Sequence, residues 1–303
     1  MHKDGHAALG YDYVIRHLEI ALNGEHWTVS RQGRPWSLPG PRRVPPEIDI
    51  HKPSAARVYD AILGGKDNFP WDRAVAEQVI AAFPEAATSA VLHRQVLERA
   101  IRYLHARGID QFLDVGSGLP TARNTHEIAQ ELNPRALVAY VDNDPIVLTH
   151  GRAQLAGDAA TTVVTADLRQ PDTIVGNPAI TAFLDFSRPI GLVLNGVVHH
   201  LNDDEDPHGV VTKLTSALAS GSYLQLTHFS TAAPAAAKLE RVLMKAIGSG
   251  RMRSADEIAA FFDGLDLVDP GIVFLPEWRP DGPVGYPLDV GGQLILGAMA
   301  RKP

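Results

Sequence analysis

The sequence contains no cysteine among its 303 residues. Disulfides, thiolate metal sites and a cysteine nucleophile are therefore excluded, and nothing points to an oxidising compartment. The sequence also lacks any apolar run near the roughly 20 residues that a membrane span requires, and its start lacks the basic-then-apolar pattern of a secretory signal. We therefore expect a cytoplasmic protein without a membrane partner.

Basic residues are outnumbered, because 28 Lys and Arg stand against 35 Asp and Glu, for a net charge of -7 and a pI near 6.0. A mildly acidic protein has no general electrostatic attraction to DNA or RNA. We therefore expect no nucleic-acid partner. Hydrophobic residues make up 45% and charged residues 21%, which is ordinary for a globular protein.

The first 48 residues differ in character from the rest. The stretch "RQGRPWSLPGPRRVPPEID" holds five prolines and four arginines, and proline resists both helix and central strand. We expect residues 1–48 to form an extended or disordered leader, in which "YDYVIRHLEIAL" is compatible with a short helix. Residues 49–108 show helical periodicity instead, in "KPSAARVYDAILGG", "WDRAVAEQVIAAF" and "SAVLHRQVLERAIRYLHARG". This segment predicts an N-terminal helical cap.

From residue 109 to 303, short apolar strands alternate with helical segments. The first five strand-like runs are "QFLDV", "LVAYVD", "TTVVTAD", "IGLVLNG" and "SYLQLTHF". Such alternation predicts right-handed crossovers and a doubly wound, Rossmann-like α/β sheet that is mostly parallel. No helical segment separates the last two runs, "LDLVDPGIVFL" and "GGQLILGAMA". We therefore expect seven strands, the last two forming an antiparallel hairpin at the sheet edge.

The loop "LDVGSGLPT" follows the first predicted strand. Gly116 and Gly118 permit a tight turn and a close approach to a ligand, and a helix that starts near Asn124 favours a negative ligand group. A dinucleotide fingerprint needs a third glycine where Thr121 stands. The carboxylate of Asp114 repels a pyrophosphate but suits an ammonium group. The loop therefore favours a zwitterionic ligand, such as the methionine end of S-adenosylmethionine, although an ordinary turn without a ligand is the alternative.

Acidic residues also end the next two predicted strands. Asp142 lies about 20 residues past the glycines, where an acidic residue commonly accepts hydrogen bonds from ribose hydroxyls. Asn143 follows it, and Asp144 is placed to cap the next helix. Asp167 ends the third strand, in position to accept a hydrogen bond from an adenine amino group, with Leu168 against the ring. Three acidic strand ends favour a shared ligand over three solvated carboxylates.

The fourth predicted strand ends at Asn195, and two histidines follow it. Adjacent residues on a turn point in different directions, so we expect at most one of His199 and His200 to face the site. A histidine here is a candidate general base, with a packed structural role as the alternative. The spacing of these histidines and of residues 203–206 matches no metal motif, so we expect no metal site.

The stretch "LGGKDNF" lacks the strand and the serine or threonine that a phosphate-binding P-loop requires. We weigh two interpretations of it equally. In one, Lys66 and Asn68 belong, with Tyr59, to a flexible cover over the pocket. In the other, the glycines end a helix and the lysine is solvated.

Taken in order, "DVGSGLP", "YVDNDP", "TADL" and "LNGVVHHLNDDE" resemble the class I S-adenosylmethionine-dependent methyltransferases. From about residue 49 onward the chain is more closely similar to a bacterial family of S-adenosyl methyltransferases of unassigned substrate, through "PSAARVYDAILGGKDNF", "VDNDPIVLTHGRA" and "FFDGLDLVDPG". The resemblance implies S-adenosylmethionine as cofactor. It assigns the methionine part to Asp114, Gly116, Ser117 and Gly118, the ribose to Asp142 and Asn143, the adenine to Asp167 and Leu168, and the border with the substrate to Asn195 and His199.

We therefore expect a methyltransferase that acts on an unidentified, small-molecule acceptor. Family members often carry a single histidine followed by an apolar residue, so His200 departs from that pattern and His199 is the candidate base. Two alternatives stay open. One is a non-catalytic module or sensor that binds S-adenosylmethionine. The other is an NAD(P)-dependent oxidoreductase, which Thr121 and Asp114 disfavour.

Overall fold

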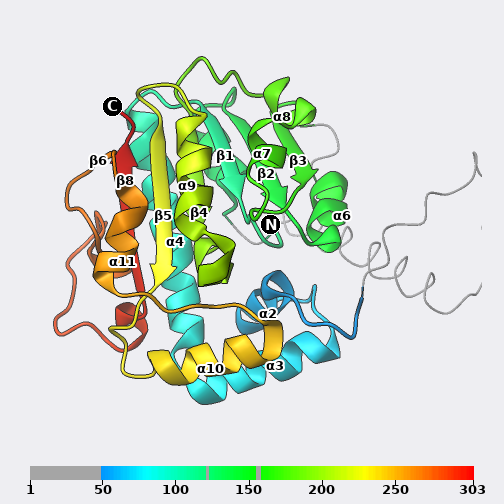
Figure 1. Cartoon of the computed structure of the whole chain (residues 1–303), viewed down its shortest axis with the longest axis vertical. Coiled ribbons are helices and arrows are strands. Elements are labelled where there is room, and N and C mark those ends of the chain that lie inside the picture. The colour runs from blue at the N-terminus through cyan, green and yellow to red at the C-terminus, as the bar shows by residue number, and fades with distance from the viewer. Residues whose placement is uncertain (1–48, 121–122, 155–157) are drawn as a thin grey trace, which may run out of the picture. The chain divides into compact units, whose positions relative to one another are not determined.

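The computed structural model describes residues 49–120, 123–154 and 158–303. The expected leader, residues 1–48 with its short helix, lies outside the described residues. Within them the strands form one sheet in the order β3-β2-β1-β4-β5-β8-β6, with β7 also pairing with β8 (Figure 1). The strands are β1 Gln111–Val115, β2 Leu137–Asp142, β3 Thr161–Thr165, β4 Gly191–Asn195, β5 Tyr223–Phe229, β6 Asp266–Leu267, β7 Val273–Phe274 and β8 Ile295–Arg301.

The sheet confirms the predicted Rossmann-like class, because β1 to β5 are parallel and β8 runs antiparallel to β5. The expected hairpin differs in detail. The run predicted as one sixth strand is divided into β6 and β7, which both pair with β8 in antiparallel fashion. A turn separates the two pieces: the amide of Gly271 donates to the carbonyl of Val268, and Gly271 has a φ of 85°. The last strand of the chain therefore lies between β5 and β6, one position in from the edge.

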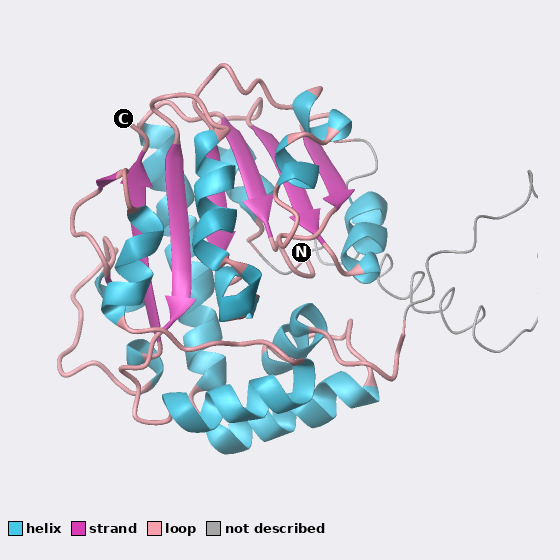
Figure 2. Ribbon diagram, in the orientation of Figure 1, coloured by secondary structure: helices cyan, strands magenta, loops and turns pink. Residues whose placement is uncertain are grey.

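Helices cover both faces of the sheet (Figure 2). The N-cap Ser54 of α2 accepts a hydrogen bond from the amide of Arg57, and Ser254 and Glu257 form a capping box at the start of α11. Asn124 and Glu127 form another at the start of α5, where the sequence predicts a helix to begin. The helices are α2 Ala55–Ile62, α3 Pro70–Ala82, α4 Ala86–Ala106, α5 Thr125–Leu132, α6 Pro145–Gln154, α7 Asp172–Val175, α8 Pro178–Thr181, α9 Pro207–Ser216, α10 Ala236–Ile247 and α11 Ala255–Ala259.

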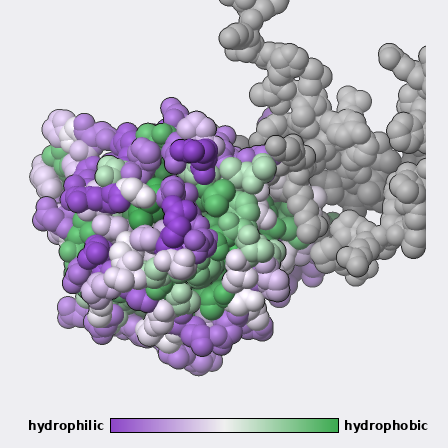
Figure 3. Space-filling view, turned by 90° about the horizontal axis from the view of Figure 1, so that it is seen from above, coloured by the Kyte–Doolittle hydropathy of each residue, from purple (hydrophilic) through white to green (hydrophobic). Residues whose placement is uncertain are grey.

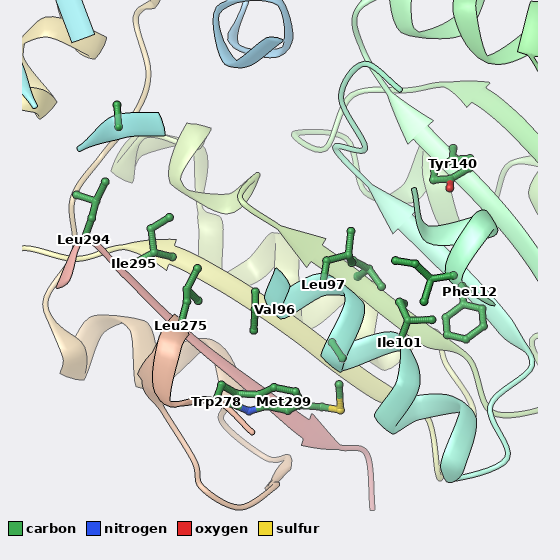
Figure 4. Packing of buried hydrophobic residues seen from close by; sticks show 14 of the residues in the cluster. Val96, Leu97, Ile101, Phe112, Tyr140, Leu275, Trp278, Leu294, Ile295 and Met299 are labelled. Carbon is green, nitrogen blue, oxygen red and sulfur yellow. The ribbon is translucent and has the colours of Figure 1, made fainter. Parts of the chain in front are cut away.

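Strand residues alternate between two hydrophobic clusters, one on each face of the sheet. Phe112 belongs to the cluster on the α4 side, whereas its neighbour Leu113 belongs to the cluster with α9. Figure 4 shows Leu97 and Ile101 of α4 extending toward Phe112. This period of two along a strand and of three to four along the helix is what binary patterning predicts.

Three helices lie beyond the carboxyl ends of the parallel strands. Figure 1 shows α2, α3 and α10 there, with α3 and α10 side by side. The ammonium of Lys238 on α10 donates to the carbonyl of Ala81 on α3 at 2.9 Å. Figure 3 views the opposite face, where hydrophilic and apolar side chains are mixed as on an ordinary protein surface. The three helices cover the edge at which doubly wound sheets bind ligands.

Candidate functional site

A cavity of about 360 Å³ lies at the carboxyl ends of β1, β2, β3 and β4. Its size falls within the roughly 300–1,000 Å³ of typical small-molecule sites. All the strand-end residues predicted from the sequence line it: Asp114, Gly116, Ser117, Gly118, Asp142, Asn143, Asp167, Leu168, Asn195 and His199. The sheet therefore brings together residues that are as many as 85 positions apart in the sequence.

The glycine loop is held tightly against its neighbours. Gly116 has a φ of 74°, and a Cβ there would lie 2.2 Å from Cγ2 of Val197. Only glycine fits this position without displacing the segment after β4. Gly118 has a φ of 67°, and its amide donates to Oδ2 of Asp142 at 2.8 Å. The loop thus closes on the end of β2 and presents its backbone to the cavity.

Asp114 is a buried carboxylate at the floor of this loop. The hydroxyl of Thr125 donates to its Oδ2 at 2.6 Å. Burial raises the pKa of Asp114 to about 6, against a smaller lowering by the Thr125 hydrogen bond and by the charge of Arg94. A carboxylate that burial has stripped of water gains from a bound cation. An ammonium group in the cavity would supply one.

Asp142 is held in place by the backbone on both sides. Its Oδ1 accepts from the amide of Asp144 at 2.9 Å, while its Oδ2 accepts from the amide of Gly118. Burial raises the pKa of Asp142 to about 6, and these backbone hydrogen bonds lower it in part. Each carboxylate oxygen accepts more than one hydrogen bond. The geometry leaves acceptor capacity for ligand hydroxyls.

The side chain of Asp167, just after β3, forms an ion pair and a hydrogen bond within the protein. Its carboxylate pairs with Arg169 at 3.2 Å, and the side-chain amide of Asn143 donates to its Oδ2 at 3.4 Å. Leu168 is buried and supplies an apolar wall beside it. An adenine contact to Asp167 would therefore form on a carboxylate that a cation already holds in position.

Asn195 and the two histidines form the wall after β4. The side chain of Gln225 donates to Oδ1 of Asn195 at 3.0 Å, which fixes the amide orientation. The ring of His199 stacks on Phe229 with centroids 3.7 Å apart. Both His199 and His200 line the cavity, so the prediction that at most one would face it is wrong. The 3₁₀ turn Val198–His200 places consecutive rings along the same wall.

These histidines are held in the neutral state. Burial lowers the pKa of His199 well below its usual 6.5, with a further lowering from His200 and His228. Burial also lowers the pKa of His200 to about 4. Within the described residues, Nδ1 of His199 is buried without a hydrogen-bond partner. A buried, unsatisfied ring nitrogen beside a cavity is the kind of group that a functional site retains at a cost in stability.

The three predicted cover residues divide into two groups. Tyr59 lines the cavity, and its hydroxyl donates to the carbonyl of Ala90 at 3.2 Å. Lys66 is exposed, and neither it nor Asn68 is among the lining residues. The side-chain amide of Asn68 donates to Oδ2 of Asp60 at 2.7 Å. This hydrogen bond folds the turn back onto α2, as the helix-end interpretation of these glycines requires.

The sequence pattern does not predict two ionisable lining residues on α4. His93 shares a hydrogen bond of 2.6 Å between its Nε2 and Oγ1 of Thr227, and its ring meets Tyr59 edge-on. Arg94 also lines the cavity, and its charge lowers the pKa of Asp114. One signal was available: Ser89 and His93 stand four residues apart, which places two polar residues on the buried face of a predicted helix.

Neither a metal site nor a membrane segment is found in the part of the chain that the structure describes. No three His, Asp or Glu side chains there are arranged to hold a metal ion. Within the same residues, no helix combines the length and the apolar character that crossing a membrane would take.

The chain matches the S-adenosyl methyltransferase family over residues 41–303. A presumed methyltransferase of Thermobifida fusca is 48% identical, with a TM-score of 0.82 over 85% of this chain and 98% of that one. A DUF574 family protein of Streptomyces avermitilis is 37% identical, with a TM-score of 0.81 over 85% of this chain and 100% of that one. No curated protein matches the sequence.

These similarities confirm the cofactor and the type of reaction expected from the sequence. They give no support to the oxidoreductase or to the non-catalytic module that the sequence left open. The chain belongs to the S-adenosyl methyltransferase family and is an S-adenosylmethionine-dependent methyltransferase.

Proposed function

We propose that the chain methylates a small molecule that binds in the cavity beside Asn195 and His199. The observation that carries this proposal is the extent of the cavity. It continues from the strand ends to side chains of α2, α3 and α10, among them Val58, Val79 and Leu243. A covered cavity of about 360 Å³ admits a small acceptor more readily than a segment of a macromolecule. The net charge of -7 likewise gives no support to a nucleic-acid acceptor.

The lining residues fit the cofactor of the family. Asp114 and Asp142 are buried carboxylates whose pKa values are raised to about 6, so each gains from a ligand donor. A Cβ added at Gly118 would meet nothing within 4 Å, so the loop leaves room beside its backbone. We assign the amino-acid end to Asp114 and the glycine loop, the ribose to Asp142 with Asn143 beside it, and the adenine to Asp167 and Leu168.

When bound, S-adenosylmethionine supplies an electrophilic methyl group on a positively charged sulfur. The contribution of the protein is then chiefly to hold the acceptor next to that methyl group. A hydroxyl or amine acceptor also gives up a proton as it is methylated. We assign the imidazole of His199 to take this proton, because His199 lines the cavity and its Nδ1 has no hydrogen-bond partner among the described residues.

The helical segment 49–108 serves in this proposal as the wall of the acceptor site. Tyr59 of α2 and His93 of α4 reach the same cavity as the strand ends. We assign the cofactor to the strand-end side, as the family resemblance implies, and the acceptor to the helical side. Residues 109–303 then form the cofactor-binding core.

A transfer experiment with cofactor labelled in its methyl group tests the proposal. The purified protein is incubated with an extract of the source organism, and the products are divided into low-molecular-mass, protein and nucleic-acid fractions. We expect label in the low-molecular-mass fraction, and much less of it with the Asp142→Ala variant at a cofactor concentration that does not saturate the variant. Label that appears in the protein or nucleic-acid fraction, and that depends on Asp142, would contradict a small-molecule acceptor.

A further inference from the structure

The cavity has a charged side and an uncharged side. Four of its six Asp and Arg lining residues are carboxylates at or after the ends of β1, β2 and β3. Arg169 pairs with Asp167, and Arg94 donates to the carbonyl of Arg123 at 2.9 Å, in the loop after β1. The charged lining residues are therefore gathered about the strand ends: Asp114, Asp142, Asp144, Asp167, Arg94 and Arg169.

The other side is apolar and comes from two distant parts of the chain. We call it the apolar chamber and define it by six lining residues from α2, α10 and the region of α3. Val79 and Phe83 are almost wholly buried, and Lys238 joins α10 to the end of α3. The walls are thus packed elements rather than loose side chains. The six residues are Val58, Ile62, Val79, Phe83, Leu243 and Ile247.

The polar groups that border the apolar chamber carry no charge. The hydroxyl of Tyr59 donates to the carbonyl of Ala90, and the hydroxyl of Ser89 donates to the carbonyl of Gly291 at 2.7 Å. Burial lowers the pKa of His93 to about 3, so this imidazole is neutral at physiological pH, as is that of His199. Arg94 is the charged group that acts on Tyr59 and His93, and it donates to the carbonyl of Arg123 in the loop after β1. The six chamber residues themselves are apolar and offer a charged acceptor body no counterion. Burying an unpaired charge costs several kcal/mol.

We infer that the acceptor is an uncharged small molecule with an apolar body and one hydroxyl or aromatic amine group, the latter being neutral at physiological pH. Its body fills the apolar chamber, and its reactive group lies at the end bordered by His93 and His199. This inference rests on the proposed function, because it assigns the chamber to the acceptor of the methyl group. It adds the chemical class that the chamber accepts.

Three naphthalene probes of the same shape test the inference: 2-naphthol is neutral, 2-naphthoate is an anion and 2-naphthylmethylammonium is a cation. Each is titrated into the protein by calorimetry, with and without saturating S-adenosylhomocysteine. We expect 2-naphthol to bind at least about tenfold more tightly than either charged probe, a difference of about 1.4 kcal/mol.

Ile62 and Ile247 are chamber residues that are only half-buried, so an introduced carboxylate there stays partly hydrated and the fold should tolerate it. In Ile62→Asp and Ile247→Asp, we expect the affinity for 2-naphthol to fall about tenfold, which corresponds to about 1.4 kcal/mol. We expect the affinity for the cationic probe to rise in both variants. The matched control is Ile80→Asp, because Ile80 on α3 is 42% exposed and does not line the cavity. Unchanged binding of S-adenosylhomocysteine shows that each variant is folded.

The inference is overturned if a charged probe binds wild type as tightly as 2-naphthol does, if no probe binds, or if both chamber variants bind the probes as wild type does. Failure of S-adenosylhomocysteine to bind wild type is a separate result that contradicts the proposed function. If S-adenosylhomocysteine does not bind, the probe titrations in its absence still test the apolar chamber. The unfolding transition of each variant then shows whether the variant is folded.

Discussion

The buried carboxylate of Asp114 lowers the free energy of unfolding of the ligand-free protein at neutral pH. Its pKa is about 6 when folded, above its usual 3.8, so the folded state holds the proton more tightly than the unfolded state. The contribution of Asp114 to the free energy of unfolding is therefore most favourable at low pH, and it is lost as pH rises from about 4 to 6. Above pH 6 the full cost of burying the charge is present. A shift of this size corresponds to about 3 kcal/mol.

We predict that Asp114→Asn stabilises the ligand-free protein at pH 7.5 by as much as about 3 kcal/mol, because the buried charge is removed while an oxygen remains for Thr125. The gain shrinks as pH falls toward 4. Urea unfolding at several pH values measures it. The same variant should bind S-adenosylhomocysteine more weakly. Equal stabilisation at pH 4 and pH 7.5 would show that the buried charge is not the cause.

Asp142 offers the most direct test of a single cofactor contact. We predict that Asp142→Ala weakens S-adenosylhomocysteine binding about 10- to 100-fold, because hydrogen bonds to a charged group contribute about 1.5–3 kcal/mol. Calorimetric titration gives the two affinities. The matched control is Asp185→Ala, which removes an exposed carboxylate that does not line the cavity. Equal affinity in the Asp142 variant and wild type would refute the ribose assignment.

At the scale of elements, the loop after β1 depends on its two glycines for different reasons. Both have positive φ, but only a Cβ at Gly116 would collide with Val197. We predict that Gly118→Ala costs about 1–2 kcal/mol from backbone strain alone. Gly116→Ala should cost about 1–3 kcal/mol more, from overpacking. Urea unfolding compares the two, and Gly116→Ala with Val197→Ala should recover part of the difference. Equal losses in the two single variants would contradict the collision.

A buried ion network joins α2 to α3 and to the start of α6. Arg57 is only 4% exposed, and it contacts Asp72 at 3.0 Å and Asp144 at 3.2 Å. The hydroxyl of Ser54 also donates to Asp144 at 2.6 Å. Because the amide of Asp144 donates to Asp142, this network connects the helical segment to the proposed ribose site.

We predict that Arg57→Met lowers the free energy of unfolding by about 3–5 kcal/mol, because it leaves two buried carboxylates without their cation. The control is Arg102→Met, since the ion pair of Arg102 with Asp281 is exposed and should contribute less than about 1 kcal/mol. Urea unfolding measures both variants. Similar small losses in the two would show that the buried network does not hold the helical segment in place.

For the molecule as a whole, the strand ends were predictable because local pattern and topology determine them. The runs of β1 and β2 were predicted residue for residue, and in a parallel sheet their ends meet at one edge. His93 was not predictable in the same way, because its place at the cavity depends on how α4 packs against the sheet. The sixth strand differs from the prediction of one continuous strand, because Pro270 and Gly271 lie in a turn that divides the run into β6 and β7.

Like the position of His93, the apolar chamber could not be predicted from the sequence. Leu243 and Ile247 are ordinary apolar residues of an amphipathic helix, and Val58 and Val79 are the same in theirs. Only their assembly over the strand ends makes them a binding wall. Long-range packing of this kind leaves no local signature.

In the proposed arrangement, the strand-end cavity holds S-adenosylmethionine, and the space for the acceptor lies on its helical side. A crystal structure of the protein with S-adenosylhomocysteine is the sharpest test of this arrangement. We expect density with the ribose at Asp142, the amino-acid end at Gly116 and Asp114, and the sulfur toward Asn195 and the apolar chamber. Density for the ligand at another place on the molecule, or with its adenine in the apolar chamber, would show that the arrangement is wrong.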